Sequence, residues 1–319
     1  MSASGVLRIG TRGSALAIWQ ARWVRDALQR QHPDLAIQLE IIKTTGDKIL
    51  DSPLSLIGDK GLFTREIEQA LLRNDIDLAV HSLKDLPTEL PAGLVLGAVT
   101  EREDVRDVFI PHPRARHRRL ADLEAGSVLA TGSLRRRAQL LAMGRSFSVV
   151  DIRGNLNTRM RRLEESTWAG MILARAGVVR LGWEEKVGET IDPNVMLPAV
   201  GQGALGIEIR GDDARTREQI AVLEHVPTRQ ATTAERALLH RLEGGCQVPL
   251  GTLARFEDGD GKRGRLVLDG LVATLEGDRV VRGSASGSPG DAEHIGTNLA
   301  EQLLSDGADE ILRQIRAGS

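Results

Sequence analysis

Residues 6–30 read VLRIGTRGSALAIWQARWVRDALQR, a short apolar run followed by a Gly/Ser junction and a longer amphipathic segment. Residues 6–10 are typical of a short buried strand. Ser14 stands where a helix N-cap is expected. The apolar residues after it recur at helical spacing, namely Leu16, Trp19, Trp23, Val24 and Leu28. This stretch therefore predicts a strand that runs directly into a helix at 15–30, as in an α/β domain.

The same junction recurs later in the chain. Residues 127–131 read SVLAT and are predicted to form a strand, and Gly132 and Ser133 lead from it into a predicted helix at 134–143. Two such junctions predict two similar domains, each with backbone N–H groups at a helix N-terminus that suit an anion. Serine at an N-cap is also common where no ligand binds, and that interpretation stays open.

The chain before residue 226 alternates between predicted strands and helices. Further strands are predicted at 35–42, 77–81, 147–152 and 171–174, and further helices at 63–73 and 156–165. Such alternation favours parallel sheets in α/β domains. Residues 43–61 are charged and only weakly periodic, and a loop of this length is more often functional than structural.

The pattern changes after about residue 226. A predicted helix at 228–242 is followed by predicted strands at 248–255, 265–274 and 279–286, and then by a helical stretch at 291–317 with a break near Gly307. Strands followed by a packed helix predict a small α+β domain with a mainly antiparallel sheet.

The composition argues against several classes of function. The 319 residues carry a formal net charge of −2 and 3% aromatic residues, so neither a basic surface nor base stacking indicates nucleic acid binding. No run of about 18 apolar residues predicts a membrane span, and the first residues do not resemble a signal peptide. The single cysteine fits a reducing cytoplasm, and the histidines show no metal-ligand spacing.

Arginines gather near predicted strand ends and helix starts, where open α/β sheets bind their ligands. Guanidinium groups pair with carboxylates or phosphates, so several together predict a polyanionic ligand. A solvated surface position is the preferred interpretation for Arg137, Arg161 and Arg162. The candidates for ligand binding are Arg12, Arg135, Arg136, Arg153 and Arg159, which flank Gly/Ser turns, together with Arg180.

The pair Lys84 and Asp85 follows the predicted strand at 77–81. Groups just past a buried strand are often catalytic, and a carboxylate there can stabilise a cation or deliver a proton. A surface ion pair at a turn fixed by Pro87 explains the same residues equally well.

The only cysteine, Cys246, follows Gly244 and Gly245 and precedes a predicted strand. Glycines permit close approach and unusual backbone conformations, and an exposed thiol near cations can act as a nucleophile. A buried, inert thiol is the usual alternative for a lone cysteine.

In this order and spacing, these segments resemble the porphobilinogen deaminase (hydroxymethylbilane synthase) family. Each match alone is weak, but the set spans nearly the whole chain and needs no large insertion. The matching segments are 8–14 with Trp19 and Gln20, 58–63, 79–87, 132–136, 153–155 with Thr158 and Arg159, 197–206, 233–236 and 242–251.

The resemblance implies an α/β fold of two lobes like those of type II periplasmic binding proteins, residues 1–103 with 201–224 and residues 104–200, and a small α+β domain at 225–319. It implies a transferase of tetrapyrrole biosynthesis that joins four porphobilinogen molecules with loss of ammonia on a covalent dipyrromethane cofactor, and then releases hydroxymethylbilane. It further implies a cytoplasmic monomer that passes its product to uroporphyrinogen-III synthase, with no nucleic acid or membrane partner and no metal.

The resemblance also assigns roles to residues. Asp85 matches the catalytic aspartate, Cys246 matches the cysteine that holds the cofactor by a thioether, and residues 43–61 match a mobile loop. Cofactor-binding roles fall on Ser14, Lys84, Asp85, Ser133, Arg135, Arg136 and Arg153, and substrate-binding roles on Arg12, Arg159, Arg180 and Gln202. Two departures, Gly132 in place of serine and Arg175 at a position often small or apolar, concern substrate contacts and not Asp85 or Cys246.

Two other functions are compatible with parts of the pattern. A non-enzymatic binder of organic anions can use the same two-lobe fold, since fold does not determine function, and an unmodified chain mass would favour it. An RNA-binding protein that uses the arginines would show salt-sensitive affinity for RNA.

Overall fold

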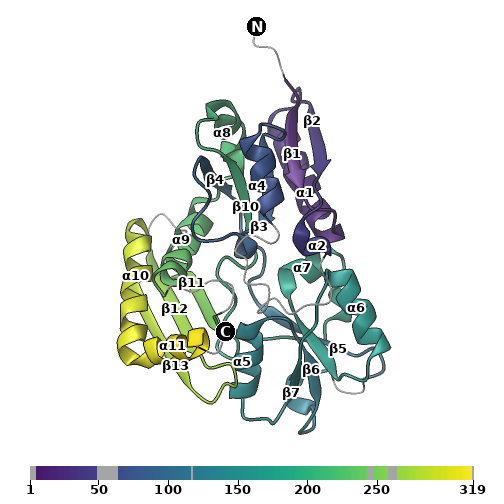
Figure 1. The fold of residues 1–319 in the computed structure, drawn as a ribbon, viewed down its shortest axis with the longest axis vertical. Helices are drawn as coiled ribbons and strands as arrows, with labels where there is room; N and C mark the ends of the chain where they lie inside the picture. The colour runs from purple at the N-terminus through teal and green to yellow at the C-terminus, as the bar shows by residue number, and fades with distance from the viewer. Residues whose placement is uncertain (1–4, 49–63, 116–117, 243–247, 258–263, 318–319) are drawn as a thin grey trace. The chain divides into compact units, whose positions relative to one another are not determined.

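The structure is a computed structural model that describes residues 5–48, 64–115, 118–242, 248–257 and 264–317 (Figure 1). The chain forms two compact units. Among the described residues, the first comprises 5–48, 64–103 and 203–229, and the second comprises 104–115, 118–202, 230–242, 248–257 and 264–317. The division into three domains stays a prediction.

The first unit contains a five-stranded sheet in the order β2-β1-β3-β10-β4. Strand β1 is parallel to β2 and β3, whereas β10 is antiparallel to β3 and β4. The strands are β1 (Leu7–Thr11), β2 (Ile37–Ile41), β3 (Leu78–Ser82), β4 (Leu94–Val99) and β10 (Leu205–Arg210).

Helices α1 (Ala15–Gln31) and α4 (Arg65–Leu72) pack on opposite faces of this sheet. Successive side chains of a strand point to opposite faces. Val80 of β3 accordingly packs in the same apolar cluster as α1, and Ala79 in the cluster of α4. The short helices α2 (Thr45–Lys48) and α8 (Ala214–Ile220) complete the unit.

Helix α1 has nearly the predicted extent, and it buries only part of its apolar set. Trp19 and Trp23 are each 36% exposed, and the helix packs instead through Ala21, Val24 and Leu28. At about 100° per residue, the two indoles lie roughly 100° or more around the helix from Val24. The helical spacing is confirmed, and the two tryptophans lie outside the core.

The second unit contains a sheet with the same arrangement, in the order β7-β6-β8-β5-β9. Strand β6 is parallel to β7 and β8, and β5 is antiparallel to β8 and β9. The elements are β5 (Asp107–Pro111), β6 (Val128–Ala130), β7 (Ser148–Val150), β8 (Gly170–Ala174), β9 (Glu189–Thr190), α5 (Leu134–Ala142), α6 (Leu156–Glu165) and α7 (Arg175–Arg180). The two similar α/β lobes predicted from the junctions are confirmed.

The prediction of parallel sheets is right for three strands of each lobe and wrong for β10 and β5. Strand β10 starts at Leu205, after the chain has passed through residues 104–202 of the other unit. It is therefore not the end of a simple strand–helix–strand crossover, for which parallel pairing is the rule. Residues 205–210 and 107–111 were not recognised as strands.

The C-terminal part is a small α+β domain, as predicted. Strands β11 (Leu250–Glu257), β12 (Arg265–Ala273) and β13 (Val280–Gly287) form an antiparallel sheet. Helices α9 (Val226–Arg241), α10 (Ala292–Leu303) and α11 (Asp309–Ala317) share its apolar core. Gly307, with φ of 105°, lies in the left-handed region between α10 and α11, which confirms the predicted break.

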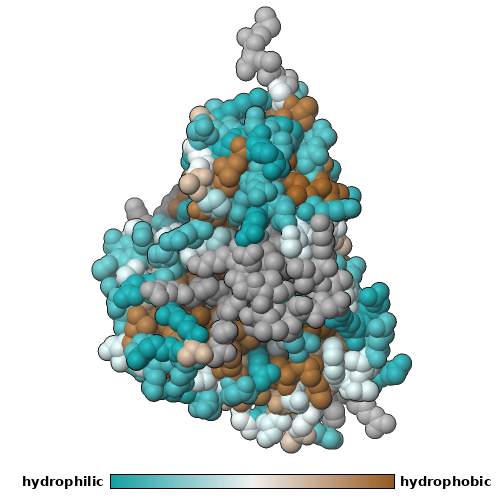
Figure 2. Space-filling view, in the orientation of Figure 1, coloured by the Kyte–Doolittle hydropathy of each residue, from teal (hydrophilic) through white to brown (hydrophobic). Residues whose placement is uncertain are grey.

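The face shown in Figure 2 carries separate groups of hydrophobic residues among hydrophilic ones. In the described part of the chain, no helix combines the length and the apolar character needed to cross a bilayer.

Candidate active site

The two strand–Ser–helix junctions have the same local geometry. The hydroxyl of Ser14 accepts a hydrogen bond from the N–H of Ala17 at 3.3 Å and caps α1. The hydroxyl of Ser133 accepts one from the N–H of Arg136 at 3.5 Å and caps α5. The predicted N-caps are confirmed, because each oxygen satisfies an N–H that the helix leaves unpaired. The carboxylate-binding roles of both serines stay predictions.

Strand β3 ends in a single 3₁₀ turn, Leu83–Asp85. The N–H of Leu83 donates to the carbonyl oxygen of Ala204 at 3.0 Å. Leu83 and Leu86 are buried in one small apolar cluster, whereas Lys84 is half-buried and Asp85 is exposed. The apolar residues of the turn therefore anchor it and leave the Asp85 carboxylate accessible to a ligand.

Three of the predicted site residues meet on one buried carboxylate. Nη1 of Arg135 lies 2.8 Å from Oδ2 of Asp107, and Nη2 of Arg136 donates to Oδ1 at 2.8 Å. The amide nitrogen of Gln202 also donates to Oδ1, at 2.8 Å, and to the carbonyl oxygen of Val105 at 2.7 Å. Asp107 is 0% exposed, and both arginines are nearly as buried. Sequence reasoning missed Asp107, although an acidic residue at the head of the apolar run 108–110 was a usable signal.

This Arg135–Arg136–Asp107 cluster has one positive charge in excess. Burial opposes ionisation of Asp107, yet the two guanidinium groups hold its pKa well below the usual range. Among the described residues, neither the Nε–H of Arg135 nor that of Arg136 has a hydrogen-bond partner. Buried unpaired donors are costly. The cluster therefore fits an anionic group that supplies hydrogen-bond acceptors.

Arg153, Arg159 and Arg180 do not join the cluster around Asp107 in the contacts described here. Nε of Arg153 lies 3.3 Å from Oδ2 of Asp151, and Nε of Arg159 donates to the carbonyl oxygen of Gly154 at 2.9 Å. Arg180 is 8% exposed. These three belong to the second unit, together with Ser133, Arg135, Arg136 and Gln202, whereas Arg12, Ser14, Lys84 and Asp85 belong to the first.

Several predicted features lie outside the described residues. They are Cys246, residues 58–63 of the matching pattern, and residues 49–61 of the predicted loop. The described start of that loop forms helix α2.

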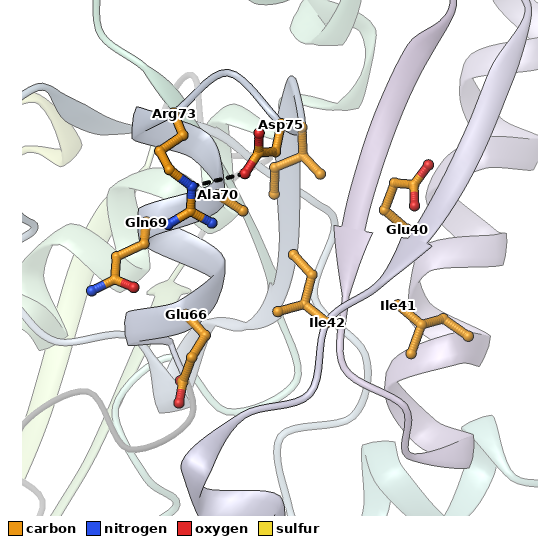
Figure 3. Close-up of a pocket in the computed structure, with 9 residues that line it drawn as sticks. Glu40, Ile41, Ile42, Glu66, Gln69, Ala70, Arg73 and Asp75 are labelled. Carbon is orange, nitrogen blue, oxygen red and sulfur yellow. Dashed lines mark hydrogen bonds and ion pairs between the residues drawn. The ribbon is translucent and has the colours of Figure 1, made fainter.

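A hollow of about 290 Å³ in the first unit lies beside β2 and α4 (Figure 3). Nε of Arg73 pairs with Oδ2 of Asp75 at its edge, at 2.9 Å. The lining residues are Glu40, Ile41, Ile42, Glu66, Gln69, Ala70, Arg73, Asp75 and Ile76. None of the predicted site residues is among them, so this hollow is separate from the predicted chemistry.

Comparison with known proteins assigns the family. Residues 7–218 match the dipyromethane cofactor binding domain of porphobilinogen deaminase, and residues 229–305 match the C-terminal domain of porphobilinogen deaminase. The chain belongs to the porphobilinogen deaminase family. It is 53% identical over 311 residues to the porphobilinogen deaminase of Desulforudis audaxviator (strain MP104C), with 98% of each chain covered. It is 52% identical over 309 residues to that of Gloeobacter violaceus (strain ATCC 29082 / PCC 7421), covering 96% of this chain and 93% of the relative.

Solved structures of other proteins also resemble the chain. The effector binding domain of BenM with benzoate is 15% identical, has a TM-score of 0.43 and covers 70% of this chain and 91% of its own. The methionine binding protein MetQ is 13% identical, has a TM-score of 0.41 and covers 70% of this chain and 90% of its own.

Membership of the porphobilinogen deaminase family makes the chain an enzyme of tetrapyrrole biosynthesis with porphobilinogen as its substrate and dipyrromethane as its cofactor. It does not favour a non-enzymatic anion binder. The residues present fit the cofactor, since its pyrroles carry carboxylate side chains and the Arg135–Arg136–Asp107 cluster offers excess positive charge and two unsatisfied donors.

The two departures from the porphobilinogen deaminase pattern have local explanations. A Cβ on Gly132 would lie 2.6 Å from the carbonyl oxygen of Ile152, so serine would require the backbone to shift. Nε of Arg175 lies 2.9 Å from Oδ2 of Asp104, and its Nη1 donates to the hydroxyl of Thr190 at 3.1 Å. Arg175 therefore has a structural role within the second unit.

Replacing Asp107 by asparagine should destabilise the protein by about 3–5 kcal/mol, because two buried guanidinium groups lose their counter-charge. Denaturant unfolding measures the loss. The folded pKa of Asp107 is depressed below the unfolded value of about 3.9. Its stabilisation is therefore fully present above that value and is lost as the pH falls through the folded pKa. The gap between parent and variant should be equal at pH 7 and pH 5 and shrink only in stronger acid.

The matched control is Glu276→Gln, which removes a 70% exposed carboxylate from the side chain of Arg137. Exposed ion pairs contribute about 0–1 kcal/mol, so this variant should be nearly as stable as the parent. An Asp107→Asn protein as stable as this control at pH 7 would contradict the assigned role of Asp107.

Proposed function

We propose that this member of the porphobilinogen deaminase family is a hydroxymethylbilane synthase, in which Asp85 is the catalytic carboxylate and Cys246 is the thioether anchor of the cofactor. The enzyme joins four porphobilinogen molecules head to tail, with loss of one ammonia at each addition, and releases the product by hydrolysis. The observation that best supports this is the Arg135–Arg136–Asp107 cluster, with its excess positive charge and its two buried N–H donors. Each porphobilinogen carries an acetate and a propionate, so the growing chain is a polyanion that such a cluster suits.

Apart from Gln202, the residues proposed to bind carboxylates are cations and helix N-caps, both of which suit an anion. A polyanionic ligand explains why arginines gather at these positions in a chain whose net charge is −2. When bound, the dipyrromethane cofactor supplies the primer to which substrate is joined. Its carboxylates are assigned to Ser14, Lys84, Ser133, Arg135, Arg136 and Arg153, and those of the substrate to Arg12, Arg159 and Arg180. Gln202 is assigned to the substrate site as a residue that holds Asp107, since both of its amide hydrogens donate to Val105 and Asp107.

Asp85 is assigned the repeated chemistry. Loss of ammonia breaks the carbon–nitrogen bond of the aminomethyl group and leaves positive charge on the substrate pyrrole. An ionised carboxylate stabilises this charge, and it can accept the proton released from the attacked pyrrole α-carbon after the new carbon–carbon bond forms. The exposure of Asp85 at the end of a firmly anchored turn supports this assignment.

Intact mass spectrometry combined with an ammonia assay tests the proposal. Protein from a host that makes porphobilinogen should have the chain mass plus two pyrrole units and should release one ammonia for each porphobilinogen consumed. The control is the same protein from a host that cannot make porphobilinogen, which should have the unmodified mass. An unmodified protein from the first host, or a modified one that releases no ammonia, would contradict the proposal.

The finer expectations from the family resemblance belong to the same proposal. They are a division into three domains, a cytoplasmic monomer, and transfer of the product to uroporphyrinogen-III synthase. Sedimentation at micromolar concentration measures the oligomeric state, and a stable dimer would contradict the expected monomer.

A further inference from the structure

Three titratable side chains that the proposed chemistry does not use are buried together in the first unit. They are His81 of β3, Glu208 of β10 and Glu68 of α4, which are 6%, 0% and 8% exposed. Nε2 of His81 lies 3.1 Å from Oε2 of Glu208. Burying such groups is costly unless they are paired. A cluster of three titratable side chains inside one lobe therefore needs an explanation.

The sheet register explains why the three side chains meet. Antiparallel pairing sets Gly206 opposite His81 and Glu208 opposite Ala79, so His81 and Glu208 lie diagonally on the same face. Helix α4 covers that face and packs against Ala79 (Figure 1). The residue that α4 adds to the pair is Glu68.

The three side chains interact electrostatically. Burial raises the pKa of Glu68 and Glu208 raises it further, whereas Thr64, His81 and Arg65 oppose the rise. Among the described residues, Oε1 of Glu208 has no hydrogen-bond partner. Within this part of the chain, the buried carboxylate of Glu208 therefore depends on His81 for its hydrogen bond.

His81 of this cluster lies near the end of β3, two residues before the turn Leu83–Asp85 begins. Strand β3 ends at Ser82, whose hydroxyl accepts a hydrogen bond from the side chain of Gln20 at 2.9 Å. The next residue, Leu83, donates its N–H to Ala204 at the head of β10. The position of the turn therefore depends on how the ends of β3 and β10 are held together, and the bond between His81 and Glu208 joins these two strands.

We propose that His81 and Glu208 are positioning residues for Asp85, because their buried hydrogen bond holds β3 against β10 where the catalytic turn begins. This inference rests on the catalytic role proposed for Asp85. A displacement of a catalytic group by about 1 Å can cost on the order of 100-fold in rate. Loss of the bond should therefore reduce turnover, while the carboxylate-binding arginines of the second unit keep their affinity for substrate.

The decisive variant replaces both partners by apolar residues, His81→Phe with Glu208→Leu. Such double replacements are often close to neutral in stability, because both partners of the buried hydrogen bond are removed together. The variant should retain its thermal midpoint and its cofactor mass, keep its KM, and lose kcat by about 10- to 100-fold. A folded variant with the kcat of the parent, or one whose KM rises as much as kcat falls, overturns the proposal.

The single variant His81→Gln is the conservative replacement. Its amide nitrogen can donate to Glu208, so it should retain most of the kcat that the double variant loses. If the double variant does not fold, Glu208→Leu carries the test, because it removes the acceptor of His81, and a kcat equal to that of the parent overturns the proposal. Asp77→Asn is the structural control, because Asp77 pairs with Arg8 at the opposite end of β3. It should lower the thermal midpoint and leave kcat unchanged.

Asp85→Asn in the same series separates the two hypotheses. If Asp85→Asn is active, the proposed function fails at Asp85. If Asp85→Asn is inactive while the double variant turns over like the parent, only the positioning role fails.

Discussion

Replacing Asp85 by asparagine should reduce turnover by about 10²- to 10⁴-fold, the usual contribution of a positioned acid–base group. The amide has nearly the shape of the carboxylate but can neither balance the positive charge on the substrate pyrrole nor accept a proton from it. Asp85 is exposed, and the turn is held by Leu83 and Leu86, so the fold should not change. Steady-state assays of porphobilinogen consumption measure the loss, and intact mass shows whether the cofactor is still attached.

The control for this variant is Glu89→Gln, which neutralises another exposed carboxylate four residues further on. It should leave kcat within about two-fold, as expected for a surface change away from the reacting atoms. An Asp85→Asn enzyme with a tenth or more of parental activity would remove Asp85 from the central role. Equal losses in both variants would point to a general effect of charge.

Replacing Cys246 by serine should abolish covalent cofactor attachment and, with it, activity. A thiolate is a far better nucleophile than a serine hydroxyl at neutral pH. Cys246 is the only cysteine of the chain, so no second thiol can replace it. Intact mass should show the bare variant chain, whereas the parent carries two additional pyrrole units.

Thiol labelling of the denatured parent supplies an independent measurement. A thioether blocks the sulfur, so the parent with its cofactor should not react, whereas parent protein prepared without cofactor should take up one label. The anchor assignment fails if the serine variant retains covalently bound cofactor, or if the cofactor-loaded parent is labelled in full.

Much of the fold is predictable from local sequence patterns, because interactions between neighbouring residues decide where helices and strands begin and end. Ser14 and Ser133 cap the helices that follow them, and α6 has the predicted bounds Leu156–Glu165. The break at Gly307 follows from the left-handed backbone that glycine permits. Their place after predicted strands indicates the arginines and Asp85 as candidates, and the structure brings Arg135, Arg136 and Gln202 together on one carboxylate.

The two lobes, the C-terminal α+β domain, the capped helices and the family pattern are all predictable from the sequence, because they depend on neighbouring residues and on hydrophobic spacing. The polar groups that meet in the interior become known only from the packed fold. Asp107 pairs with Arg136 across 29 positions and with Gln202 across 95, and His81 meets Glu208 across 127. Hydrophobic spacing shows which face of an element is buried, but not which element it meets or in which direction that partner runs. The antiparallel strands β5 and β10 bring these partners together, and their direction is set by packing over long separations.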